Sequence, residues 1–128
     1  MGRLWKLTHK IQSIVPQKKR KNRFTVTLES GDVFGISGDV LISNPLEGGQ
    51  TLTKKALKHL KRIETRQQIK IRVLRLLSYR QRSRAEVLTL LKRKGYIEDD
   101  IVPVLDKLDS KGYMDDKAFA KMYASYLI

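Results

Sequence analysis

Clusters of Lys and Arg are the residues whose types and spacing point most directly to chemistry. The chain of 128 residues carries 27 Lys and Arg against 13 Asp and Glu, a formal net charge of +14. Five of the six residues from 18 to 23 are basic, and they lie between two predicted strands. A basic hairpin tip of this kind can contact phosphates, or can simply keep a turn solvated. The density of charge favours binding to a polyanion.

A second basic cluster, residues 79–84, precedes a predicted helix. Arginines beside the free backbone N–H groups of a helix N-terminus favour anions. The alternative is that Ser83 and Glu86 form a capping box while Arg80 pairs with an acid of the next helix. Further basic residues flank this cluster on predicted helices. The candidate binding residues are Lys18, Lys19, Arg20, Lys21, Arg23, Lys70, Arg72, Arg75, Arg80, Arg82, Arg84, Lys92, Arg93 and Lys94.

Residues that could support catalysis are scarce. His9 and His59 are the two histidines, and neither lies in an Asp or Cys pattern that would make it a base or a ligand. Sequence motifs for nucleotide binding, for a serine nucleophile and for zinc proteases are missing. The acidic pairs 99–100 and 115–116 could bind Mg²⁺, but helix N-termini attract acids in any case. We therefore predict no catalytic residue, no metal site and no cofactor.

Composition narrows the class of protein further. With 41% hydrophobic residues the chain can fold, and without Cys it has neither disulfides nor thiolate zinc sites. No apolar run approaches the ~18 residues of a membrane span. The first residues lack the apolar segment of a secretion signal. We expect a cytoplasmic protein that does not associate with membranes. Residues 1–63 carry net +9, residues 64–97 net +8 and residues 98–128 net −3, so the polyanion would meet the first three quarters of the chain.

The first half must supply strands to hold the first cluster. Residues 23–29 alternate apolar and polar side chains, which is typical of a half-buried strand, and residues 9–15 and 33–36 read as its neighbours. Residues 38–43 favour a short helical turn. Thr53 is a candidate N-cap for a helix from Lys54 to about residue 63, which would cover the apolar face of the sheet.

The second half is predicted to be helical. Apolar residues at helical spacing occupy 69–77, and a helix capped by Ser83 runs to about residue 94. The sequence Lys-Gly-Tyr followed by acids occurs at residues 94–99 and again at 111–116. In both copies the Gly suits a left-handed helix end and the acids suit the next helix start. Helices are predicted over about 101–108 and 119–126.

These elements predict an α+β fold in two domains. A β-rich domain, residues 1–64, has a small antiparallel sheet with a helix. A helical domain, residues 65–128, has one three-helix unit followed by the first helix of a further unit.

The residues of the second half resemble the RecX family of recombinase regulators. The resemblance rests on residues 76–86, on Lys94-Gly95-Tyr96 and on residues 108–120, and the segments 11–19 and 34–41 look like the β-rich extension of some members. Family members often carry Pro where Gln81 stands here. They also carry more three-helix units, so we expect this chain to be the N-terminal portion of a longer protein.

The resemblance implies a non-enzymatic regulator that binds RecA filaments on DNA and modulates RecA, by inhibiting its ATPase activity and strand exchange or by destabilising the filament. It implies a RecA partner and sequence-nonspecific contact with single- or double-stranded DNA, and we expect a monomer. A general nucleic-acid-binding module of helix-turn-helix type is the alternative. A Mg²⁺-dependent enzyme built on the two acidic pairs is a third hypothesis, and the net negative charge of residues 98–128 argues against it.

Overall fold

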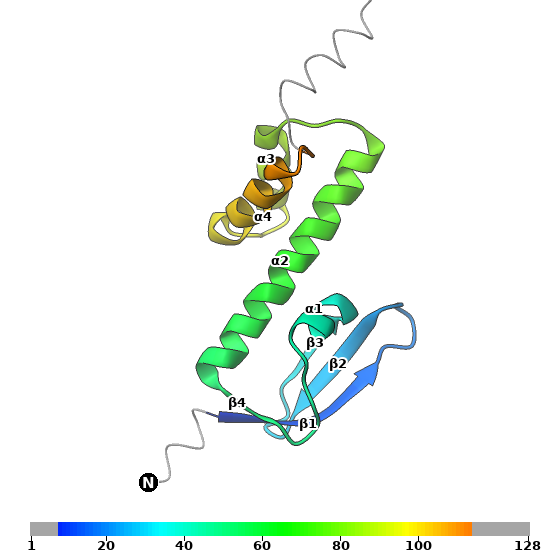
Figure 1. The fold of residues 1–128 in the computed structure, drawn as a ribbon, viewed down its shortest axis with the longest axis vertical. Coiled ribbons are helices and arrows are strands. Elements are labelled where there is room, and N and C mark those ends of the chain that lie inside the picture. Colours follow the sequence, from blue (N-terminus) through cyan, green and yellow to red (C-terminus); the bar gives the residue numbers. More distant parts are fainter. Residues whose placement is uncertain (1–7, 114–128) are drawn as a thin grey trace, which may run out of the picture. The chain divides into compact units, whose positions relative to one another are not determined.

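The computed structural model describes residues 8–113. The chain divides into two compact units, residues 1–64 and 65–128, and each is described by itself. The fold is α+β, as predicted (Figure 1). Its elements are β1 (Thr8–Pro16), β2 (Arg23–Leu28), β3 (Val33–Ser37), α1 (Gly38–Ser43), β4 (Thr51–Thr53), α2 (Lys54–Tyr79), α3 (Arg84–Arg93) and α4 (Glu98–Ser110).

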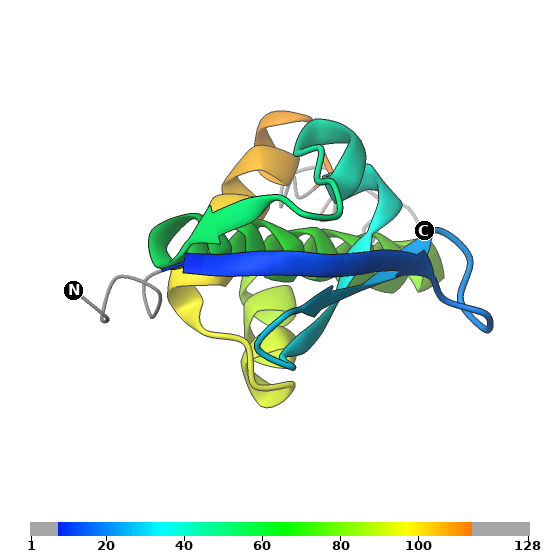
Figure 2. The same ribbon diagram turned by 90° about the horizontal axis from the view of Figure 1, so that it is seen from below.

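The first unit contains one antiparallel sheet in the order β3-β2-β1-β4. The sheet is twisted, with β2 and β3 running obliquely to the long strand β1 (Figure 2). Three of its strands were predicted to within one residue at each end. The prediction missed β4, whose three residues pair with Thr8–Lys10 of β1. A three-residue strand is too short to show alternation, because only a partner strand distinguishes it from a loop.

The core of the first unit joins the sheet to two helices. Val26 and Leu28 of β2 are fully buried, as the alternation predicted. They pack with Ile11 and Ile36 of the neighbouring strands, with Val40 of α1, and with Leu57 and Leu60 of α2. Thr53 accepts a hydrogen bond from the Ala56 N–H at 3.0 Å, which confirms it as the cap of α2.

Helix α2 corrects the predicted helix end near residue 63. It continues without a break from Lys54 to Tyr79 and passes through the boundary between the units at Glu64. The reason lies in residues 64–68, Glu-Thr-Arg-Gln-Gln, which include neither Gly nor Pro. The change in hydrophobic pattern there reflects a change in what the helix packs against, and not an end of the helix.

The second unit has its own core, formed by the later part of α2 with α3 and α4. Ile69 and Val73 of α2 pack with Val87 and Leu91 of α3, and the core is completed by Ile101, Leu105 and Leu108 of α4. Pro103 lies inside α4 and cannot donate to the Asp99 carbonyl, which instead accepts a hydrogen bond from the Arg66 side chain at 3.4 Å. The predicted helix 119–126, and with it the start of a further unit, lies outside the described residues.

Both Lys-Gly-Tyr copies end a helix in the same way. Gly95 and Gly112 have positive φ, 99° and 85°. The Tyr96 N–H donates to the Leu91 carbonyl at 3.2 Å and the Gly95 N–H donates to the Lys92 carbonyl at 3.0 Å, the two bonds of a Schellman motif. Tyr113 and Gly112 repeat this pattern after α4. The predicted left-handed helix ends are confirmed.

Replacing Gly95 with Ala is expected to destabilise the second unit by about 1–2 kcal/mol, because a β-carbon disfavours the left-handed conformation. Open space surrounds the site, so the cost is conformational and not steric. Urea unfolding followed by circular dichroism measures it. Gly48→Ala is the matched control, since Gly48 lacks a positive φ and its new β-carbon would meet only an ordinary contact. Equal losses in the two variants would contradict the assignment.

Candidate functional site: the basic surfaces

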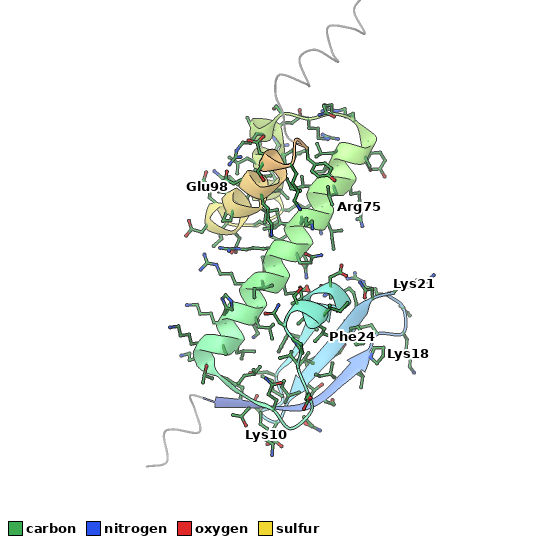
Figure 3. The ribbon with its side chains drawn as sticks, in the orientation of Figure 1. Lys10, Lys18, Lys21, Phe24, Arg75 and Glu98 are labelled. Atoms are coloured by element: carbon green, nitrogen blue, oxygen red, sulfur yellow. The ribbon has the colours of Figure 1, made fainter. Side chains whose placement is uncertain are left out.

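The loop between β1 and β2 exposes four consecutive cations, Lys18, Lys19, Arg20 and Lys21. We call these four residues the hairpin loop. In the part of the chain that the structure describes, none of them forms an ion pair. Lys18 and Lys21 extend from the end of the hairpin, away from the sheet (Figure 3). Four uncompensated charges on one exposed turn form a surface that attracts phosphates.

The base of the hairpin loop is held at both ends. The Gln17 N–H donates to the Arg23 carbonyl at 2.9 Å, and the Gln17 side chain donates to Thr25 Oγ1 at 3.3 Å. At the other end Asn22 adopts a positive φ of 59° and its carbonyl accepts the Gly38 N–H at 2.8 Å. A β-carbon on Gly38 would lie 1.9 Å from the Asn22 side-chain oxygen, so any larger residue there would displace the Asn22 side chain. These hydrogen bonds therefore fix both ends of the loop that carries the four cations.

Arg23, the last member of the predicted cluster, is turned inward. Its guanidinium pairs with Glu64 of α2 at 3.4 Å, and the two side chains are 18% and 6% exposed. Glu64 also accepts the Ser37 N–H at 2.6 Å. Arg23 thus ties β2 to α2 within the first unit and presents little charge to a ligand.

The arginines of the second cluster are largely paired within the second unit. Arg80 and Arg82 both contact the Glu86 carboxylate, Arg82 at 3.1 Å. Arg84 reaches Asp106 at 2.6 Å and Asp109 at 3.8 Å on α4. This is the alternative that the sequence left open, in which Arg80 pairs with an acid of the next helix.

Ser83 caps α3 as predicted, accepting the Glu86 N–H at 3.2 Å. Glu86 does not complete the capping box, because its carboxylate pairs with Arg80 and Arg82. The N-terminus of α3 therefore already has an anionic group in its first turn, the Glu86 carboxylate.

The remaining candidates lie on α2 and at the end of α3. Lys92 pairs with Glu98 at 3.0 Å, and Lys70 is half-buried. Arg72, Arg75, Arg93 and Lys94 line a groove of about 370 Å³ in the second unit. Arg72 also donates to the Tyr96 hydroxyl at 3.1 Å. Figure 3 marks Arg75 on α2.

Two of the acids at the start of α4, Glu98 and Asp100, have structural partners. Asp100 pairs with Arg66 at 3.6 Å, and Arg66 also donates to the Asp99 carbonyl at 3.4 Å. Among residues 8–113 no group of three or more His, Cys, Asp or Glu side chains could hold a metal ion. Asp115 and Asp116 lie outside these residues. No helix in the described range is long and apolar enough to cross a membrane.

Sequence reasoning missed two features of these surfaces. Glu64 was not singled out, because the predicted helix ended near residue 63, although its position in a stretch of few acids was a signal. The groove was missed because Tyr79 and Leu90 were assigned to a connector and a helix separately. Their meeting depends on the packing of α2 with α3.

The comparisons with known proteins agree with one another. Residues 70–108 match the family model described as the first three-helix domain of RecX. The chain is 34% identical over 119 residues to the regulatory protein RecX of Oceanobacillus iheyensis and 32% identical over 115 residues to that of Bacillus subtilis. It spans 44% of the length of each relative, and these alignments cover 89% and 90% of this chain.

A crystal structure of a regulatory protein RecX is similar in fold, with a TM-score of 0.75 and 29% sequence identity. The similarity covers 93% of this chain and 58% of the chain in that structure. Both the sheet unit and the helical unit therefore fall within the matched part.

Proposed function

Because this chain belongs to the RecX family, we propose that it is a regulator that binds RecA recombinase filaments on DNA and inhibits RecA ATPase activity and strand exchange. The observation that carries the proposal is the match of residues 70–108 to the first three-helix domain of RecX. Sequence and fold similarity across both units support it. Since the chain spans less than half the length of these relatives, inhibition by the chain itself is the property to be tested.

The proposal includes two domains with different surfaces. Residues 1–64 form a β-rich domain whose hairpin loop contacts phosphates, and residues 65–128 form a helical domain that contacts the filament. Contacts made by exposed Lys and Arg to phosphates carry no sequence information, so DNA binding is sequence-nonspecific. In this proposal the protein acts as a monomer, without a cofactor, in the cytoplasm.

The helix-turn-helix alternative has less support from the described helices. A reading helix inserts its N-terminal residues into the major groove. The first turn of α4 holds three acids, Glu98, Asp99 and Asp100, which phosphates would repel. At the start of α3, Arg84 is paired with two acids of α4. Neither helix presents a free basic N-terminus to DNA.

The test is DNA-stimulated ATP hydrolysis by RecA, measured while this chain is titrated in at moderate salt. We expect the rate to fall by at least about half below one chain per recombinase subunit, because a bound regulator acts on the filament and not on each DNA site. A lysine-rich peptide of equal net charge is the control for simple competition for DNA.

Two results would oppose the proposal. Equal inhibition by the lysine-rich peptide would mean that charge alone displaces RecA from DNA. No inhibition at a stoichiometric excess, together with tight binding to naked DNA, would instead favour the nucleic-acid-binding module.

A further inference from the structure

The groove in the second unit has an apolar floor. Leu76 of α2 and Leu90 and Leu91 of α3 line the groove together with Tyr79, and we call the three leucines its floor. Leu91 is 1% exposed and belongs to the core, whereas Tyr79 is 78% exposed at the end of α2. The floor is therefore continuous with the packed interior. A space of about 370 Å³ above it is large enough for apolar side chains to enter.

All the charged residues that line the groove are positive. Arg72, Arg75, Arg93 and Lys94 line the groove, and no Asp or Glu is among its lining residues. Arg75, Arg93 and Lys94 form no ion pair in the described part of the chain, and Arg72 is bonded to a tyrosine hydroxyl and not to an acid. The nearby acid Glu98 is paired with Lys92. Four positive charges around an apolar floor favour a ligand that is apolar in the middle and anionic at its edges.

We propose that this groove docks an acidic amphipathic segment of a partner protein, with large aliphatic or aromatic side chains on the leucine floor and carboxylates on the four cations. Docking of an amphipathic helix in a groove between two helices has this geometry. The inference goes beyond the proposed function, because it concerns the chemistry of one surface and does not require the partner to be a recombinase.

The lining favours a peptide over a nucleic acid. Single-stranded nucleic acids bind to aromatic platforms on which successive bases stack. This groove offers one aromatic ring, Tyr79, against three leucines. Its polar lining groups are mostly donors, so they would meet carboxylates well but leave the donor edges of bases without acceptors. Arginine also pairs with carboxylates in a bidentate manner, which adds directionality to the contact.

The test is fluorescence anisotropy of a labelled peptide built of three Glu-Glu-Leu-Phe repeats, titrated with the full chain. We expect saturable binding that weakens at least about tenfold in the variant Arg75→Glu with Arg93→Glu, because both lining charges then repel the peptide. Leu90→Glu should weaken binding in the same way. The matched control, Lys55→Glu with Lys58→Glu, makes the same charge change on the exposed part of α2 in the first unit and should retain binding.

Two further probes determine what the groove recognises. A Glu-Glu-Ser-Ser peptide should bind poorly, because it lacks the apolar side chains. A labelled oligothymidine should bind the Arg75 and Arg93 variant as well as it binds the unmodified chain. Equal weakening of peptide binding by the control pair, or loss of oligothymidine binding in place of peptide binding, would overturn the proposal. RecA inhibition is measured separately, so a failure here leaves the proposed function standing, and the reverse also holds.

Discussion

Glu64→Ala is expected to lower the free energy of unfolding of the first unit by about 3 kcal/mol, since removing one partner of a buried ion pair leaves the other charge without compensation. The Arg23 side chain is 18% exposed, and its Nε is buried without a hydrogen-bond partner in the described part of the chain. The same change removes the acceptor of the Ser37 N–H just before α1. Urea unfolding followed by circular dichroism would show a lower midpoint.

A second variant separates charge from packing. Replacing Arg23 and Glu64 together with Met should recover much of the loss, because an apolar pair of similar volume leaves no uncompensated charge. Glu29→Ala is the control, since Glu29 is 57% exposed and pairs with Lys10 on the surface. A Glu64→Ala midpoint equal to that of the control would show that the buried pair contributes nothing to stability.

Local signals predicted most of the elements. The alternation of residues 23–29 identified β2 and the residues it buries, Val26 and Leu28, because strand periodicity is written in the chain itself. Thr53 and Ser83 identified two helix starts, and Gly95 and Gly112 identified two helix ends. Helix caps and turns depend on a few neighbouring residues, so they can be predicted from the local sequence alone.

Features that depend on distant partners were not predictable in the same way. The strand β4 exists because Thr51–Thr53 meets β1 more than forty positions earlier in the chain. The uninterrupted α2 carries one apolar stripe for the sheet and another for α3 and α4, and the change of stripe was interpreted as a helix end. Neither partner is specified by residues next to the element in question.

The basic clusters illustrate the same limit at the candidate site. Residues 18–21 and 79–84 look alike in sequence, and both are rich in Lys or Arg. In the folded chain, Glu86 and the acids of α4 pair with arginines of the second cluster. Within the described residues, no acid pairs with residues 18–21. Counting charges predicted a basic protein, but it could not show which charges are neutralised by pairing. Arg84, for example, pairs with Asp106, 22 positions later in the chain. We therefore give the hairpin loop more weight than the arginines of residues 80–84.

Neutralising the hairpin loop is expected to weaken binding to single-stranded DNA by about a hundredfold at low salt and to reduce the slope of log K against log salt by about 3, because each lost phosphate contact removes about 0.7 from that slope. The four cations are exposed and unpaired in the described structure, so all four can contact phosphates. Anisotropy of a labelled oligothymidine at several salt concentrations measures both quantities. The variant carries Lys18→Gln, Lys19→Gln, Arg20→Gln and Lys21→Gln.

A matched variant removes the same number of charges from exposed helix positions. Its substitutions are Lys54→Gln, Lys55→Gln, Lys58→Gln and Lys107→Gln. If DNA responds only to the net charge of +14, both variants lose affinity equally and the hairpin loop has no special role. A loss confined to the hairpin variant, with unchanged urea midpoints, places the contact on the loop. Position then matters because Gln17 and Asn22 fix the ends of the loop, so its four charges meet the phosphates without first ordering the backbone.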